Sequence, residues 1–206
     1  MKVQVSTRKV ESEHIVQLFD CPESCAEGVS SFIADALAAG RPTLVVAKTR
    51  NWTRIANELT MRGVALSHSL ESGALTVLDA SDTLSSFMQA ERPNETLFNQ
   101  HVGTLVGRLA DAASAPLCVY GEMVEILAEM GDFHGAAELE ALWNDLARKH
   151  SFTLLCGYSS GHFGPEHAGP ALQAICQAHS KVLTQASDPL GEWLASRVKP
   201  SPASAS

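Results

Sequence analysis

The chain has 206 residues, 45% of them hydrophobic, and a formal net charge of −8 at pH 7, which together predict one acidic globular domain. Because contacts to phosphates require clustered Lys and Arg, this charge argues against direct nucleic-acid binding. No apolar run approaches the length of a bilayer span and residues 1–14 lack a signal-peptide core, so we expect a cytoplasmic protein without membrane contacts.

The sequence divides into three parts. Residues 1–12 are polar and predict a flexible N-terminal arm, whereas residues 13–185 carry the pattern of a folded domain. Residues 186–206 predict a partly disordered tail, with a short apolar patch around Trp193 before the terminal SPASAS.

The first half of the domain alternates strands and helices. A β-branched apolar run predicts a strand over residues 14–19, and Asp20 as N-cap, Pro22 in the first turn and Glu23 predict a helix that ends at Gly40. The continuous apolar run 43–47 is typical of a strand covered on both faces, and a helix follows over residues 51–62.

The alternation of strands and helices is then interrupted before it continues. We expect residues 64–73 to be irregular and residues 74–79 to form a third strand. Asp79 or Ser81 can cap a helix that carries Leu84, Phe87 and Met88. The ERPN sequence predicts a break, because a residue before proline is pushed out of the helical region, and a longer helix follows from Glu95 to about Ala113.

Residues 116–159 read as a strand, a crossover helix and a second, parallel strand. The glycine- and proline-punctuated segment 159–170 is a candidate lid. A final helix is expected to place six residues on one stripe: Leu172, Ile175, Cys176, His179, Val182 and Leu183. Together the elements predict a three-layer α/β fold with a mainly parallel sheet of about five or more strands.

Nucleotide-binding signatures are missing from the expected positions. The turn after the first strand reads DCPESCAE, without the glycines and lysine of a phosphate loop, and its two carboxylates would repel a triphosphate. No GxGxxG fingerprint is present either. We therefore expect no ATP hydrolysis, no cofactor and no enzymatic activity.

Ligands of open parallel sheets bind at the carboxyl ends of the strands, which selects the candidate residues. The candidates are Asp20, Cys21, Glu23, Lys48, Asp79, Tyr120, Glu122, Tyr158, Ser159 and His179. Glu122 can polarise a ligand, or it can cap the next helix or make a structural hydrogen bond. Asp20 and Glu23 are more simply a capping pair, and His179 a core histidine. Lys48 can hold an anionic ligand or belong to a charged surface turn.

The five cysteines are best interpreted as buried thiols in a reducing compartment. Cys21 lies in the first turn of a predicted helix, where the helix dipole can lower the pKa of a thiol, and Cys25 lies one turn on. Their CxxxC spacing differs from the CxxC of metal and redox sites, and no second cluster accompanies it. Two ordinary small residues are the simpler interpretation.

Seven segments resemble one known family. They are HIVQLFD (14–20), the helix that ends at Ala39 and Gly40, LTVLDASDTLSSFM (75–88), GEMVEIL (121–127), LEALWNDL (139–146), FTLLCGY (152–158) and CQAHSKVL (176–183). Over residues 14–184 the chain is similar to MEDS, the methanogen and methylotroph sensory domain of the repressor that governs dichloromethane dehalogenase expression. The resemblance implies a fold like that of the RecA and KaiC ATPases without a working nucleotide site. It also implies a sensor of small organic compounds such as hydrocarbon derivatives.

We therefore expect a non-enzymatic cytoplasmic sensory domain that binds a small organic molecule at the carboxyl edge of its sheet. Its partner would be a histidine kinase or a transcription regulator, and a homodimer is possible. One alternative is a ligand-free protein-interaction module that docks through the tail. Another is a thiol or metal sensor that uses Cys21 and Cys25, together with His14 or His179.

Overall fold

The computed structural model describes residues 12–112, 114–163 and 170–183. The predicted N-terminal arm, apart from Ser12, and the predicted tail lie outside the described residues, as does half of the proposed lid, residues 164–169. In the described part, none of the helices combines the length and apolar character that a bilayer crossing needs.

Within the described residues, six strands form one sheet in the order β3-β2-β6-β7-β1-β8. All pairings in this sheet are parallel, which confirms the expected α/β class. Its strands are β1 (Glu13–Phe19), β2 (Thr43–Ala47), β3 (Leu75–Asp79), β6 (Leu117–Gly121), β7 (Phe152–Ser159) and β8 (Lys181–Leu183). Phe19 pairs with Ser159 and Val46 with Gly121, so the carboxyl ends of the central strands meet at one edge.

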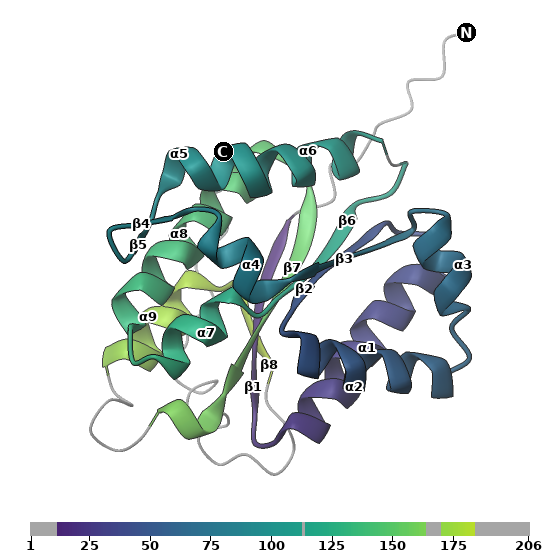
Figure 1. The fold of residues 1–206 in the computed structure, drawn as a ribbon, viewed down its shortest axis with the longest axis horizontal. Coiled ribbons are helices and arrows are strands. Elements are labelled where there is room, and N and C mark those ends of the chain that lie inside the picture. Colours follow the sequence, from purple (N-terminus) through teal and green to yellow (C-terminus); the bar gives the residue numbers. More distant parts are fainter. Residues whose placement is uncertain (1–11, 113, 164–169, 184–206) are drawn as a thin grey trace, which may run out of the picture.

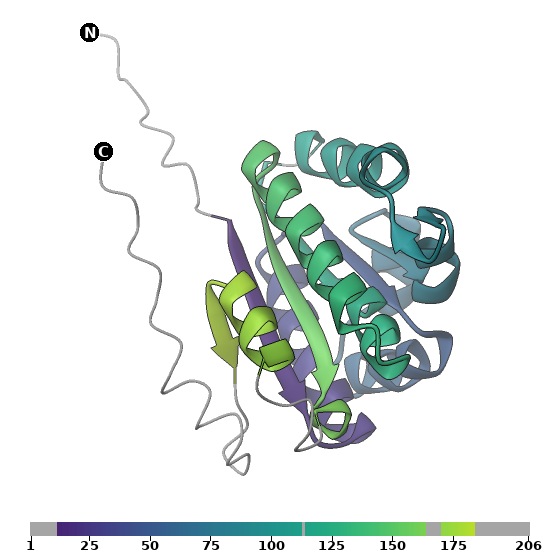
Figure 2. The ribbon, with the colours of Figure 1, turned by 90° about the vertical axis from the view of Figure 1, so that its left-hand side faces the viewer.

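Helices cover both faces of the sheet (Figure 1). One face is covered by α1 (Pro22–Ala38) and α2 (Thr49–Met61), with α3 (Leu66–Glu71) next to β3. The other face carries α4 (Ala80–Ser85), α5 (Glu95–Phe98), α6 (Thr104–Asp111), α7 (Met123–Glu129), α8 (Phe133–Lys149) and α9 (Pro170–Ala178). Figure 2 shows the three layers from the side, with α9 and β8 at one edge.

Each strand of the centre contributes to two cores. In β2 all five residues are buried: Val45 packs with the core under α1 and α2, and Val46 with the core under α7 and α8. This two-sided burial explains why the central strands read as continuous apolar runs and not as alternating patterns.

The start of α1 differs from the prediction by one residue. The N-cap is Cys21 and not Asp20: the Ser24 N–H donates to Cys21 Sγ (3.5 Å), and the Cys21 N–H donates to Ser24 Oγ (3.4 Å). Asp20 instead accepts a hydrogen bond from Ser160 Oγ (3.0 Å) at the end of β7. The predicted Asp20–Glu23 capping pair is therefore wrong, because the Asp20 side chain is bonded to the turn that follows β7.

Two connections contain structure that the sequence did not predict. Residues 64–73 were expected to be irregular, but Leu66–Glu71 forms α3. The break after α4 is a hairpin of β4 (Met88–Gln89) and β5 (Arg92–Pro93), so Met88 lies on a strand and not on the predicted helix. Its turn places two non-glycine residues, Ala90 and Glu91, at positive φ.

The predicted long helices are also divided. Residues from Glu95 onward form α5, a π-helical turn (Asn99–Gly103) and α6, which ends at Asp111. The crossover between β6 and β7 contains two helices, α7 and α8, separated at Gly131 (φ 77°), which adopts the left-handed conformation that favours glycine.

The last predicted helix ends early. It was expected to continue past Val182, but α9 ends at Ala178 and residues Lys181–Leu183 form the edge strand β8. The Ser180 N–H and hydroxyl both donate to His14 O (2.7 and 2.9 Å), which directs the chain alongside β1. Pairing with an open strand edge therefore overrides the helical spacing of this segment.

Gly157 of β7 lies against aromatic rings of the two neighbouring strands, β1 and β6. A Cβ atom at this position would lie 2.8 Å from Phe19 Cε2 and 3.0 Å from Tyr120 Oη, and both rings are buried. We expect Gly157→Ala to lower the free energy of unfolding by about 1–3 kcal/mol, because overpacking forces these rings to shift. Urea unfolding measures the change.

Gly121→Ala is the matched control on the adjacent strand. Its Cβ would meet only Leu154 Cδ1, at 3.9 Å, so we expect little change in stability. Equal losses for both variants would contradict this account of the packing.

Candidate functional site

A pocket of about 190 Å³ lies at the carboxyl ends of β1, β2, β6 and β7. The starts of α1 and α2, the inner face of α7 and His162 complete its walls. Most of the sequence candidates line it: Asp20, Cys21, Lys48, Tyr120, Glu122, Tyr158 and Ser159. Parallel strands in level register bring these residues together from separate parts of the chain.

Glu122 forms the most extensive polar contacts of this pocket. The carboxylate is buried, with 1% exposure, and Oε2 accepts the Lys48 N–H (2.6 Å). Oε1 accepts the Tyr120 hydroxyl (2.8 Å) and the Asn51 amide (3.0 Å). The side chain does not cap α7. It makes structural hydrogen bonds that tie the end of β6 to the first turn of α2.

Tyr120 and Cys25 form the wall of the pocket toward α1. Their Oη and Sγ atoms are 3.5 Å apart, and burial raises the pKa of the Cys25 thiol to about 12. Burial, with the nearby Glu122 charge, also raises the pKa of Tyr120 well above its usual range. Both groups are therefore neutral near pH 7. Cys21 is exposed and engaged in the N-cap, so these contacts give no support to a Cys21–Cys25 sensor.

Sequence reasoning missed the pair Glu125 and His162. Glu125 Oε2 accepts the Ser159 N–H (2.9 Å), and Oε1 lies 3.0 Å from His162 Nε2. Burial raises the pKa of Glu125, although the Ser159 and His162 contacts oppose this effect. The available signal was the i,i+3 spacing of Glu122 and Glu125, which turns both carboxylates to one side at the start of α7.

The lining is richer in carboxylates than in cations. Asp20, Glu122, Glu125 and Glu129 face Lys48 and Arg50. The Lys48 ammonium lies 3.1 Å from Glu129 Oε2, and this hydrogen bond lowers the pKa of Glu129. Such a lining disfavours phosphate groups, which carry several negative charges.

Three candidates lie away from the pocket lining. Glu23 is exposed and contacts Arg54 at 3.8 Å. Asp79 caps α4 through the N–H groups of Ser81 and Asp82, and it accepts the Thr49 hydroxyl (2.7 Å), the contact that chiefly lowers its pKa. His179 is buried in a separate polar cluster with His14, Glu140 and Cys156, none of which lines the pocket.

The contacts of Glu122 predict the effect of removing its acceptor oxygens. Glu122→Met keeps the size of the side chain but leaves the Lys48 N–H without its partner. We expect the free energy of unfolding to fall by about 1–3 kcal/mol, as for an unsatisfied buried donor. Glu129→Met is the matched control, because Glu129 is half-exposed and its ion pair with Lys48 is worth at most about 1 kcal/mol. Urea unfolding measures the loss of stability in each variant. An equally small loss at both positions would contradict the assigned role of Glu122.

Comparison with known proteins adds one result to this geometry. Residues 13–180 match the family model described as the methanogen/methylotroph, DcmR sensory domain, MEDS. No curated protein sequence matches the chain. The matched stretch covers most of the chain and runs from β1 through α9, with the whole pocket lining inside it. The chain therefore belongs to the MEDS family of sensory domains.

Proposed function

We propose that this domain senses a small organic compound, which it binds without catalysis in the pocket at the carboxyl edge of the sheet. The observation that carries the proposal is the pocket itself, because its walls come from four strand ends and three helices. Family membership supplies the sensory role. The pocket supplies a place where a ligand can change the contacts between those elements.

The size and lining of the pocket favour a compound smaller than a nucleotide. Its volume of about 190 Å³ is below the roughly 300–1,000 Å³ of sites for drug-sized ligands. Phe19, Pro22 and the two tyrosine rings add apolar surface next to the polar groups. A short hydrocarbon derivative with one polar group fits this combination, which agrees with the compounds that MEDS domains are thought to sense.

The start of α1 argues against a phosphate ligand. In phosphate-binding folds this helix terminus offers free backbone N–H groups to the anion. Here Pro22 has no N–H, and the Ser24 N–H is already bonded to Cys21 Sγ. Asp20 adds a negative charge at the same place. These features support sensing over nucleotide hydrolysis.

The contacts of Glu125 suggest how binding is passed on. This carboxylate joins α7 to Ser159 and to His162 in the turn Ser160–His162, which leads toward α9. A ligand that contacts Glu125 would favour one arrangement of this turn, and the population of that arrangement would rise with ligand concentration. We propose that a histidine kinase or a transcription regulator in the cytoplasm reads this change, with the domain acting as a monomer or a homodimer.

Thermal unfolding with a panel of short alcohols, ketones and halogenated hydrocarbons tests the proposal. At a concentration 100 times its Kd, a bound compound adds about 2.7 kcal/mol of stability, which raises the Tm of a domain of this size by about 5–10 °C. Cys21→Trp should abolish the shift, because an indole at this position fills the pocket mouth.

Glu23→Trp is the matched control, since Glu23 lies in the same helical turn but does not line the pocket. This variant should respond to the same compound as the original chain. A Tm shift that survives Cys21→Trp would place the binding site elsewhere, and no shift with any compound would count against small-molecule sensing.

A further inference from the structure

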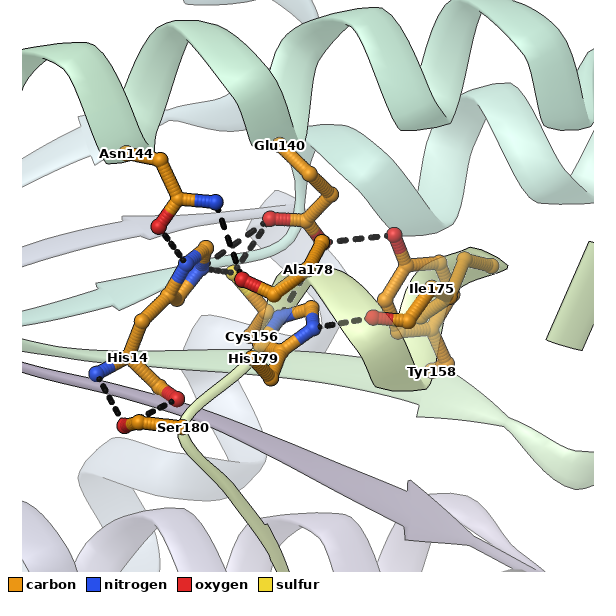
Figure 3. Close-up of polar contacts among 9 residues, drawn as sticks. All are labelled: His14, Glu140, Asn144, Cys156, Tyr158, Ile175, Ala178, His179 and Ser180. Atoms are coloured by element: carbon orange, nitrogen blue, oxygen red, sulfur yellow. Dashed lines mark hydrogen bonds and ion pairs between the residues drawn. The ribbon is translucent and has the colours of Figure 1, made fainter. Parts of the chain in front are cut away.

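A second polar cluster lies in the core between the sheet and helices α8 and α9 (Figure 3). Its members are His14 of β1, Glu140 of α8, Cys156 of β7 and His179, which directly follows α9. All four side chains are buried, and the Glu140 side chain has no exposed surface. None of the four lines the pocket at the sheet edge.

The ligating atoms of the four side chains converge. His14 Nε2 lies 3.0 Å from Glu140 Oε2 and 3.4 Å from Cys156 Sγ. Cys156 Sγ lies 3.5 Å from Glu140 Oε2, and His179 Nε2 lies 3.4 Å from Glu140 Oε1. Each side chain offers one such atom within 4.8 Å of all the others.

The proton on the His14 ring can be assigned from its neighbours. The Asn144 amide donates through Nδ2 to Ala178 O (2.9 Å), so Oδ1 of Asn144 is the atom that faces His14 Nδ1 (2.9 Å). Because this oxygen can only accept, His14 Nδ1 carries a proton. The lone pair of the neutral ring is therefore on Nε2, which points at Glu140 and Cys156.

His179 has the same arrangement. Its Nδ1 donates to Ile175 O (2.6 Å), a carbonyl that can only accept. Its Nε2 is fully buried and has no hydrogen-bond partner, although Glu140 Oε1 lies 3.4 Å away. Both histidines therefore present Nε2 to one carboxylate, and one of these nitrogens is an unsatisfied polar atom.

Each protonation state of the two rings leaves a mismatch at the buried Glu140 carboxylate. If the rings are neutral, two nitrogen lone pairs face its oxygens. If one ring is protonated, it can pair with Glu140, but the Nε2 lone pair of the other ring still faces that carboxylate. If both are protonated, two imidazolium rings with centroids 4.0 Å apart share one buried carboxylate. A metal ion between the four atoms would accept every lone pair and neutralise the carboxylate.

We propose that His14, Glu140, Cys156 and His179 bind one divalent transition-metal ion of the zinc class. Two imidazole nitrogens, a thiolate and a carboxylate are typical zinc ligands, whereas Mg²⁺ and Ca²⁺ prefer oxygen alone. In a tetrahedral zinc site the ligand atoms are roughly 3.3–3.7 Å apart. Four contacts among these residues, at 3.0–3.5 Å, lie close to this geometry, and one ligand atom of each residue lies within 4.8 Å of all the others.

The surrounding contacts are those of a metal site. Ligating histidines usually donate their other ring N–H to a carbonyl or carboxylate, as His14 does to Asn144 and His179 does to Ile175. The Tyr158 hydroxyl donates to Glu140 Oε1 (2.7 Å) and fixes the carboxylate. Coordination converts the Cys156 thiol to a thiolate, and the proton leaves to solvent.

Four protein ligands leave no open position, so the ion would serve structure and not catalysis. It would hold α9 and the segment before β8 against β1, β7 and α8. This site is separate from the Cys21–Cys25 pair and needs neither of those residues.

Cobalt substitution of the full chain tests the site directly. Protein stripped with a chelator and dialysed should bind one equivalent of Co²⁺, with strong visible bands of tetrahedral cobalt and a thiolate-to-cobalt charge-transfer band. Cys156→Ser should remove the charge-transfer band. Cys118→Ser is the matched control, because Cys118 is an equally buried strand cysteine outside the cluster, and this variant should retain the band.

Competition with a chromophoric zinc chelator measures the zinc affinity of single variants, and so the contribution of each residue. His179→Gln should weaken zinc binding by roughly 100-fold or more, and Asn144→Ala, which keeps all four ligands but removes the partner of His14, by about 10- to 100-fold. His101→Gln changes an exposed histidine outside the cluster and should leave the affinity unchanged.

The unsubstituted chain decides the question even if a variant fails to fold. A stoichiometric cobalt–thiolate spectrum from it supports the proposal. Absence of Co²⁺ and Zn²⁺ uptake overturns it, as does a charge-transfer band that persists in Cys156→Ser or disappears in Cys21→Ser.

Discussion

The burial of Glu140 is the constraint on which the C-terminal half of this domain depends. A carboxylate with no exposed surface has lost its hydration, and hydrogen bonds or positive charges must replace it. Burial alone would raise its pKa, but the nearby charges of His179 and His14, with the contact from His14, outweigh that effect and hold the pKa well below its usual range. Meeting this requirement brings β1, β7, α8 and the end of α9 together, and an ion among the same atoms would meet it more completely.

The interior cluster and the pocket at the sheet edge share strand β7. Tyr158 lines the pocket, while its hydroxyl donates to Glu140 in the cluster (Figure 3). One residue later, the Ser159 N–H donates to Glu125 on the pocket wall. A ligand that moves the end of β7 would therefore act against a firmly held strand. Under the proposed function, the response would therefore be confined to the turn after Ser159.

Much of this architecture could be predicted from the sequence. Parallel strands that are buried on both faces have continuous apolar sequences, and these runs are recognisable. The carboxyl ends of β6 and β7 lie level, which brings Tyr120, Glu122 and Tyr158 into one pocket, as their positions at the ends of the predicted strands implied. The errors arose where a long-range contact overrode a local pattern, as where β8 paired with β1 in place of further helix. Glu140 was missed because a charged residue among the leucines of α8 reads as exposed, although its i,i+3 spacing from Trp143 places it on the buried face.

Anomalous diffraction at the zinc absorption edge, from crystals of the full chain grown with Zn²⁺, is the most direct measurement of the central claim. We expect one strong peak enclosed by His14 Nε2, Glu140, Cys156 Sγ and His179 Nε2. An interior without anomalous density, or a peak that lies only at the exposed Cys21, would contradict it.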